Sequence, residues 1–181
     1  FSIWSKIKMA GSLVLIQETT TSSAVSSVTL TGIDSTYDVY KVIYSNVQPD
    51  TDAQKLAIRF TVSGTPDTSA NYDRAHVVFN SDSSFTDQSA SNNSSINTLD
   101  QGGTGTQETL QGINYLFNFS NSSEFSFITY EGSAVSSAAK LNARQGGGVL
   151  TEQQANDGIQ YFFASGNINT GANFKLYGIV K

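Results

Sequence analysis

The sequence predicts an all-β protein: an antiparallel β-sandwich, jelly-roll-like, with a short N-terminal arm. Eight tyrosines and eleven phenylalanines stand against one methionine and one tryptophan, and aromatic residues favour pleated sheets. About nine or ten alternating runs are separated by turn residues at the spacing typical of sandwiches and barrels. No period of roughly 20 to 50 residues repeats, so a propeller or solenoid is not expected.

The composition suits one sandwich domain over residues 11–181, preceded by an arm over residues 1–10. Charged residues make up 14% of the chain, and the net charge is −5. Because nucleic-acid binding requires clustered Lys and Arg, and the basic residues here are scattered, no nucleic-acid partner is expected. The longest apolar run, Leu13 to Ile16, is far below the roughly 20 residues that cross a bilayer, so no membrane partner is expected either. The chain has no cysteine, so its stability must come from its core or from subunit contacts.

The arm begins with FSIWSKIK, and its apolar side chains are the candidate partner contacts: Phe1, Ile3, Trp4 and Ile7. This segment is too short and too polar to be a secretory signal. Met9, the only methionine, opens MAGS like an ordinary translation start, which leaves open whether the preceding octamer is a natural arm, an upstream extension or an expression remnant. An exposed tryptophan beside isoleucine is unfavourable in water, so an ordered arm is expected to dock on a neighbouring molecule.

Alternation of apolar and polar residues predicts the strands of the first part of the chain. They cover Ser12–Glu18, Ala24–Leu30, Asp38–Asn46, Lys55–Val62 and Arg74–Asn80. The fourth has the cleanest pattern, with four side chains expected to point inward: Leu56, Ile58, Phe60 and Val62. The alternating positions are expected to point outward: Lys55, Ala57, Arg59 and Thr61.

The region after Asn80 lacks a strong periodic pattern. Ser81–Asn97 is dominated by Ser, Asn and Asp, and with Asp100–Gln107 it is expected to form a long loop. Phe85 and Ile96 are its expected anchors in the core.

Two aromatic runs, Ile113–Phe119 and Phe125–Glu131, flank a polar stretch and predict a hairpin. Their aromatic stripe is typical of core at strand spacing, although it could also serve as a carbohydrate platform. Its members are Tyr115, Phe117, Phe119, Phe125 and Phe127. Beyond it the sequence predicts a strand at Ala134–Asn142, a glycine break at Gln145–Gly148 and one helical turn at Glu152–Asp157.

The last two runs, Ile159–Ser165 and Asn173–Val180, flank the Gly/Asn-rich stretch Gly166–Ala172, which predicts a closing hairpin. The final run carries bulky residues on both faces, so it is interpreted as buried on both sides. In a jelly roll the first and last strands can lie side by side. We therefore expect Ser12–Glu18 to pair with Phe174–Val180.

No residue pattern of the chain predicts catalysis or a cofactor. His76 is the only histidine and lies inside a strand, so a structural role is expected for it. The paired aspartates lack the spacing of a glycosidase or an EF-hand and are interpreted as turn formers, with a loop calcium site left open. They are Asp50 with Asp52, Asp67 with Asp73, and Asp82 with Asp87. The glycine clusters at 102–105 and 146–148 lack the context of a phosphate loop. We thus expect no catalytic, cofactor-binding or metal residues, and no enzyme.

Five stretches carry a resemblance to a known family. They are GSLVLIQE at Gly11–Glu18, GIDSTYDVYKVIY at Gly32–Tyr44, SANYD at Ser69–Asp73, YLFNFSNSSEFSFITYEGSA at Tyr115–Ala134 and FKLYGIVK at Phe174–Lys181. Together they resemble small virion structural proteins of tailed phages of marine and cyanobacterial hosts, of the head-decoration or tail-fibre type. The resemblance covers nearly everything after Met9 and carries no catalytic residue.

The resemblance implies a non-enzymatic structural protein on the particle surface, assembled in the host bacterial cytoplasm. The expected role is a capsid decoration or head-fibre protein that binds the major capsid protein as a homotrimer. The alternative is a tail-fibre receptor-binding module that recognises a host cell-surface glycan. A third alternative, a hydrolytic enzyme, is disfavoured because its catalytic constellations are missing.

Overall fold

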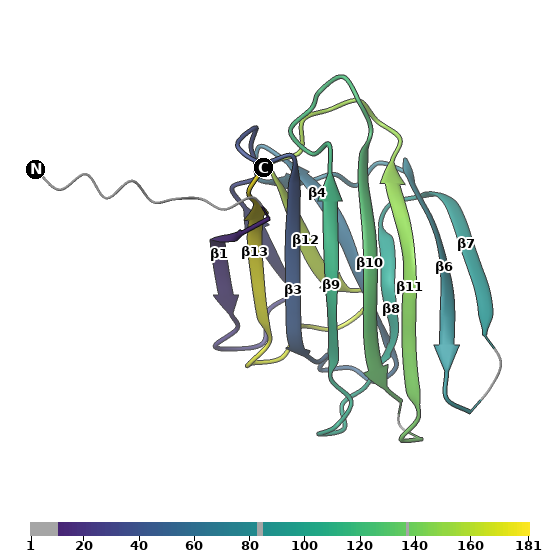
Figure 1. The fold of residues 1–181 in the computed structure, drawn as a ribbon. Coiled ribbons are helices and arrows are strands. Elements are labelled where there is room, and N and C mark those ends of the chain that lie inside the picture. Colours follow the sequence, from purple (N-terminus) through teal and green to yellow (C-terminus); the bar gives the residue numbers. More distant parts are fainter. Residues whose placement is uncertain (1–10, 83–84, 137) are drawn as a thin grey trace, which may run out of the picture.

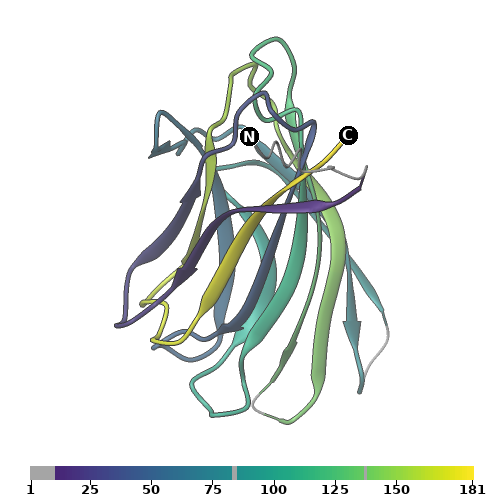
Figure 2. The same cartoon turned by 60° about the vertical axis from the view of Figure 1, so that its left-hand side comes forward.

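The computed structural model describes residues 11–82, 85–136 and 138–181, which form two facing antiparallel β-sheets (Figures 1 and 2). Within these ranges there is no helix. The larger sheet is in front in Figure 1, with β4, β12 and β8 behind it. The predicted all-β antiparallel sandwich is therefore confirmed, while its jelly-roll subtype and the arm over residues 1–10 stay predictions.

The larger sheet has eight strands in the order β1-β13-β3-β9-β10-β11-β6-β7. Every neighbouring pair in it is antiparallel. In this order the strands are β1 (Leu13–Thr20), β13 (Asn173–Ile179), β3 (Val39–Val47), β9 (Leu110–Phe117), β10 (Ser126–Val135), β11 (Leu141–Leu150), β6 (Tyr72–Asn80) and β7 (Thr86–Asn93).

The smaller sheet has five strands, and its path runs β2-β12-β4-β5 with β8 also paired to β4. The strands are β2 (Ser27–Thr31), β12 (Gly158–Phe163), β4 (Gln54–Val62), β5 (Thr65–Pro66) and β8 (Ile96–Gly102). Its inward side chains include the fully buried Leu30, Ile58 and Phe60.

The core lies between the sheets because successive side chains of each strand point to opposite faces. In β3 the alternation buries Tyr40, Val42 and Tyr44, each at most 2% exposed. The predicted inward positions of β4 are confirmed for Leu56, Ile58 and Phe60. The predicted pattern is wrong at Val62, which is expected to point inward, and at Ala57 and Thr61, which are expected to point outward. Val62 is 37% exposed because it ends β4 beside a turn, whereas Ala57 and Thr61 are buried, with the Thr61 hydroxyl donating to the Asp157 carboxylate.

The predicted pairing of the first and last strands is confirmed, since β1 pairs with β13 from Leu13 opposite Ile179 to Thr20 opposite Asn173. The predicted closing hairpin is wrong, because β12 and β13 belong to different sheets. Their apolar faces meet across the interior instead of pairing edge to edge. The connection that crosses between the sheets is fixed by backbone hydrogen bonds of Ile168 with Val25.

The predicted long loop after Asn80 is also wrong, because it contains β7 and β8. β7 is a polar edge strand, so it has no apolar alternation that could reveal it. Ile96 is fully buried as predicted, but Phe85 is 71% exposed and does not anchor in the core.

The predictions around β11 need correction as well. Residues 136 and 138–140 lie between β10 and β11 and are not part of a strand, and the Ser136 amide donates a hydrogen bond to the Lys140 carbonyl. The predicted glycine break lies inside β11, where a Cβ on Gly146 would come within 2.3 Å of the Ala75 carbonyl oxygen. Residues 152–157 are not helical, because their side chains bond to other segments, as Asn156 does to Ser126.

Candidate functional site on the larger sheet

The outer face of the larger sheet is the most distinctive surface of the described residues. We define the outer face as the side chains of the eight-stranded sheet that point away from the smaller sheet. Antiparallel pairing aligns these side chains in rows that cross the strands. The side chains on the opposite face of each strand form the core between the sheets. Apolar residues on the outer face therefore do not contribute to that core.

One row near the start of β1 is almost entirely apolar, and we call it the apolar row. It consists of Leu13, Ile179, Val39, Phe117, Phe127 and Val149, in that order across six strands. Leu13 is 45% exposed and Phe127 is 43% exposed, while the other four are half-buried. A contiguous exposed apolar surface of this kind marks an interaction site in a soluble protein.

The next row combines two aromatic side chains with a lysine and a threonine. Tyr177, Lys41, Tyr115 and Thr129 follow one another across β13, β3, β9 and β10. The Lys41 ammonium lies 5.2 Å from the centroid of the Tyr115 ring, a cation–π contact between neighbours in this row.

The aromatic stripe predicted to be core is thus mostly a surface feature. Phe119 is buried as expected, but Phe125 and Phe127 are exposed, and Tyr115 and Phe117 are half-buried on the outer face. Strand spacing could not reveal this, because aromatic residues occur on either face of these strands, as Phe127 and Tyr130 do on opposite faces of β10. The correction restores the alternative interpretation of the stripe as a binding platform.

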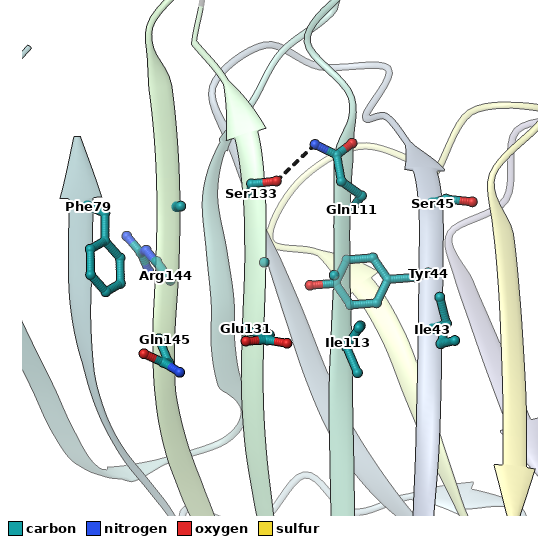
Figure 3. Close-up of a pocket in the computed structure, with 13 residues that line it drawn as sticks. Ile43, Tyr44, Ser45, Phe79, Gln111, Ile113, Glu131, Ser133, Arg144 and Gln145 are labelled. Carbon is teal, nitrogen blue, oxygen red and sulfur yellow. Dashed lines mark hydrogen bonds between the residues drawn. The ribbon is translucent and has the colours of Figure 1, made fainter. Parts of the chain in front are cut away.

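A groove of about 570 Å³ runs across β3, β9, β10, β11 and β6 on this face (Figure 3). Two rows of side chains form its walls. One wall carries Ile43, Ile113, Glu131 and Gln145, and the other carries Ser45, Gln111, Ser133, Ala143 and Phe79. The Gln111 amide donates a hydrogen bond of 3.1 Å to the Ser133 hydroxyl along the second wall.

Two glycines form the floor of this groove. Gly112 and Gly132 are paired directly across β9 and β10 and point inward. A Cβ on Gly112 would lie 2.3 Å from the Tyr44 hydroxyl, and one on Gly132 would lie 2.7 Å from Leu99 Cδ1. Glycine is therefore required so that the Tyr44 ring can fill the space under the groove.

The outer face of the smaller sheet provides a contrast. Its central positions are polar, as in the cross-strand row Thr29, Gln160 and Arg59. Phe162 is the large apolar side chain there, and the Arg59 guanidinium covers it at 4.4 Å from the ring centroid. This surface has no apolar row, so the eight-stranded sheet is the better candidate for a binding surface.

A polar layer lies directly beneath the outer face, around the buried His76. The Tyr130 hydroxyl lies 2.7 Å from His76 Nδ1, and the Gln88 amide oxygen lies 3.2 Å from Nε2. With the Nε2–H donating to Gln88, Nδ1 accepts from Tyr130. Burial, followed by the nearby Arg144 charge, lowers the pKa of His76 to about 4, so the ring is neutral at pH 7.

Arg144 joins the two sheets through this layer. Its guanidinium forms an ion pair with Asp100 of β8, and the Arg144 side chain is 2% exposed. Burial lowers the pKa of Arg144 and the Asp100 carboxylate opposes that effect. Because His76, Tyr130 and Arg144 are all sealed under the sheet, they have the contacts expected of structural groups.

The structure places the predicted site residues as follows. The candidate partner contacts Phe1, Ile3, Trp4 and Ile7 lie outside the described residues. Asp50 acts as a turn former, accepting from the Asn167 amide at 2.8 Å, a bond that lowers the pKa of its carboxyl. Asp67 likewise accepts from the Ser69 amide at 2.7 Å.

Within the described ranges, no three histidine, cysteine or carboxylate side chains converge in a way that could hold a metal ion. The same part of the chain contains no helix long and apolar enough to span a membrane. The glycine cluster at 102–105 is organised by Glu108, whose carboxylate accepts from the Gly105 amide at 3.0 Å.

Searches of protein-family models, of curated proteins and of solved structures found no match to this chain.

Proposed function

We propose that the chain is a non-catalytic structural protein of a tailed-phage particle, and that it assembles through the outer face of its eight-stranded sheet. The observation that carries the proposal is the apolar row, together with the groove beside it. The resemblance of five stretches to small virion proteins is the reason for proposing that the assembly is a phage particle. Head decoration, with the major capsid protein as a partner and the chain as an oligomer, is the role favoured by that resemblance.

Solvation free energy explains why this face needs a partner. Burying apolar surface is favourable by roughly 25 cal/mol per Å², so covering the half-exposed Phe127 and Leu13 would stabilise an assembly. Monomeric proteins rarely leave an apolar strip across six strands in water. An assembled particle is a setting in which such a strip can be covered permanently.

The environment of the titratable groups is also consistent with a binding role. A general acid or base has to reach its substrate within hydrogen-bond distance. His76 is 5% exposed and already bonded to Tyr130 and Gln88, so it offers no free group to a ligand on the surface. The groove across β3 to β6 presents amides, hydroxyls and apolar side chains together with the Glu131 carboxylate, a mixture that is suited to recognition.

The location of the protein tests this proposal. Particles of the phage that encodes the chain would be purified, and their proteins identified by mass spectrometry. We expect the chain in intact particles, at a stoichiometry that immunogold labelling assigns to the head. Particles that lack the chain would overturn the proposal, and labelling confined to the tail tip would favour the alternative below.

The alternative is a receptor-binding module for a host cell-surface glycan, and one observation favours it. Half-exposed aromatic rings such as Tyr115 and Tyr177 lie beside a groove whose walls carry the Gln111 and Gln145 amides. Rings stack on the apolar faces of sugars, and amides bond to their hydroxyls. The isolated domain would then block phage adsorption to host cells, and Gln145→Ala with Gln111→Ala would abolish that effect.

A further inference from the structure

We propose that the outer face binds the outer face of a second copy of this chain, so that two sandwiches pack sheet against sheet around a two-fold axis. The inference rests on the proposed role of the outer face as a protein-binding surface, and it names the partner. Three observations carry it: the distribution of exposed apolar side chains, the area of the face and the asymmetry of its charges.

The exposed large apolar side chains are concentrated on this face. Seven such residues occur among the described residues, and four of them belong to the outer face: Leu13, Leu15, Phe127 and Leu141. A fifth, Phe85, packs against Phe79 at the rim of the groove, with ring centroids 5.2 Å apart. The apolar surface therefore extends from β1 to β6, which is too wide for a single small ligand and suits a protein surface of equal width.

The area of the face matches what a stable interface needs. Eight strands give seven spacings of about 4.8 Å, and about seven residues of roughly 3.3 Å separate its ends, so one face covers on the order of 800 Å². Two copies would bury on the order of 1,600 Å² in total, the standard size of a specific protein–protein interface. Packing two sheets face to face also reproduces the geometry that already exists inside each sandwich.

The charges of the face are divided between its two halves. The half formed by β1, β13 and β3 carries Lys175 and Lys41, with Glu18 paired to Lys175 at 3.3 Å. On the half beyond β9, the charged side chains that the structure describes on the outer face are all carboxylates: Glu131, Asp73 and Asp87. Rotation about a two-fold axis along the central strands places each cationic half over the anionic half of the other copy. This complementarity points to a second copy, because the face supplies both the charges and their counterparts.

Grooves between the rows can accept the side chains of the opposing sheet. Gly147 and Ala75 form a row of small residues between Val149 and Gln145. The resulting groove of about 500 Å³ is lined by Phe127, Thr129 and Val149 among others. With the two-fold axis along the strands, each row faces the same row of the partner, so this depression faces the large side chains at the other end of its own row, Tyr177 and Leu15.

Sedimentation equilibrium of the full chain over a dilution series tests the proposal. We expect the parent to reach twice the mass of one chain. Phe127→Arg should raise the dimer dissociation constant by at least about 30-fold, because it places a charge in the apolar row that the partner would cover. The matched control is Val62→Arg, which places the same charge at an exposed apolar residue of the other sheet and should leave the dissociation constant unchanged. Far-UV circular dichroism of each variant establishes that it is folded.

A charge-reversal pair tests the two-fold orientation. Lys41→Glu should weaken the dimer because its half would then face carboxylates, and Glu131→Lys in the same chain should restore most of the loss. A parent that remains monomeric at about 100 µM, a trimer, or a dimer that Phe127→Arg leaves intact would each overturn the inference. A negative sedimentation result would not change where the protein is found in the particle. Its absence from purified particles would not change a dimer measured in solution. The two proposals can therefore fail independently.

Discussion

Tyr161 of β12 and Phe174 of β13 face each other across the interior, with ring centroids 5.0 Å apart. The two strands are neighbours in sequence but belong to different sheets, and these rings are the contact that joins them. Tyr44 of β3 lies next to both, at 5.6 Å from Tyr161 and 6.2 Å from Phe174. The centre of the sandwich is therefore an aromatic cluster contributed by both sheets.

Truncation of this cluster should destabilise the fold. Phe174→Ala removes a fully buried ring, and we expect the free energy of unfolding to fall by about 3–5 kcal/mol, since a cavity remains where the ring was. Urea denaturation measures the change. Tyr177→Ala, on the outer side of the same strand, is the control and should cost about 1 kcal/mol or less. Equal losses for the two variants would contradict the assignment of the inner and outer faces of β13.

Stability should depend on pH through His76. Its folded pKa of about 4 lies below the 6.5 of the free side chain, so the unfolded state binds the proton more readily between these values. The free energy of unfolding should therefore decrease as pH falls from about 6.5 to about 4, by about 3 kcal/mol in total. Denaturation at pH 7 and pH 4.5 measures it. His76→Gln should remove most of this pH dependence, and a variant with the slope of the parent would contradict the account.

The ion pair between the sheets should be costly to break from one side. Arg144→Met leaves the Asp100 carboxylate without its partner under the sheet, and we expect a loss of about 3–5 kcal/mol. The double variant Arg144→Met with Asp100→Leu should recover most of that loss, because no uncompensated charge remains. Thermal unfolding of the parent and the two variants measures both effects. A double variant as unstable as Arg144→Met would show that packing, not the unpaired charge, causes the loss.

Adjacent glycines of β11 should respond differently to alanine. A Cβ at Gly146 would lie 2.3 Å from both the Ala75 carbonyl oxygen and His76 Cβ, so Gly146→Ala should cost about 1–3 kcal/mol through overpacking. At Gly147 the nearest atom is the Ile128 carbonyl oxygen at 3.2 Å, and the new methyl group would point to the outer face. Gly147→Ala should therefore be the milder change in a denaturant titration, and the reverse order would contradict the register of β11.

The sequence alone predicts the elements whose alternation is strong. Leu56, Ile58 and Phe60 are placed on the correct face of β4, and the pairing of β1 with β13 is anticipated. The polar edge strand β7 escapes prediction because most of its residues are exposed, so no apolar alternation marks it in the sequence. The closing hairpin is wrong because a Gly/Asn-rich connection suits a crossing between sheets as well as a tight turn.

The candidate site is less predictable than the fold. Bulk on both faces of the last strand is visible in the sequence, through Phe174 and Leu176 on one side and Tyr177 and Ile179 on the other. This pattern predicts that both faces of the strand are buried. In the single chain only the face with Phe174 and Leu176 is buried, and Tyr177 and Ile179 are half-buried. The rows of the outer face also depend on the register of eight strands drawn from distant segments, which local patterns do not specify.

The most direct measurement of the central claim uses the absence of cysteine from this chain. Particles would be prepared with Thr129→Cys on the outer face, or with Thr31→Cys on the outer side of the smaller sheet, and treated with a maleimide. Both threonines are exposed in the single chain. We expect Thr129→Cys to be protected in the assembled particle and Thr31→Cys to be labelled. Equal labelling of both positions would contradict the proposal that the outer face is the surface through which this protein assembles.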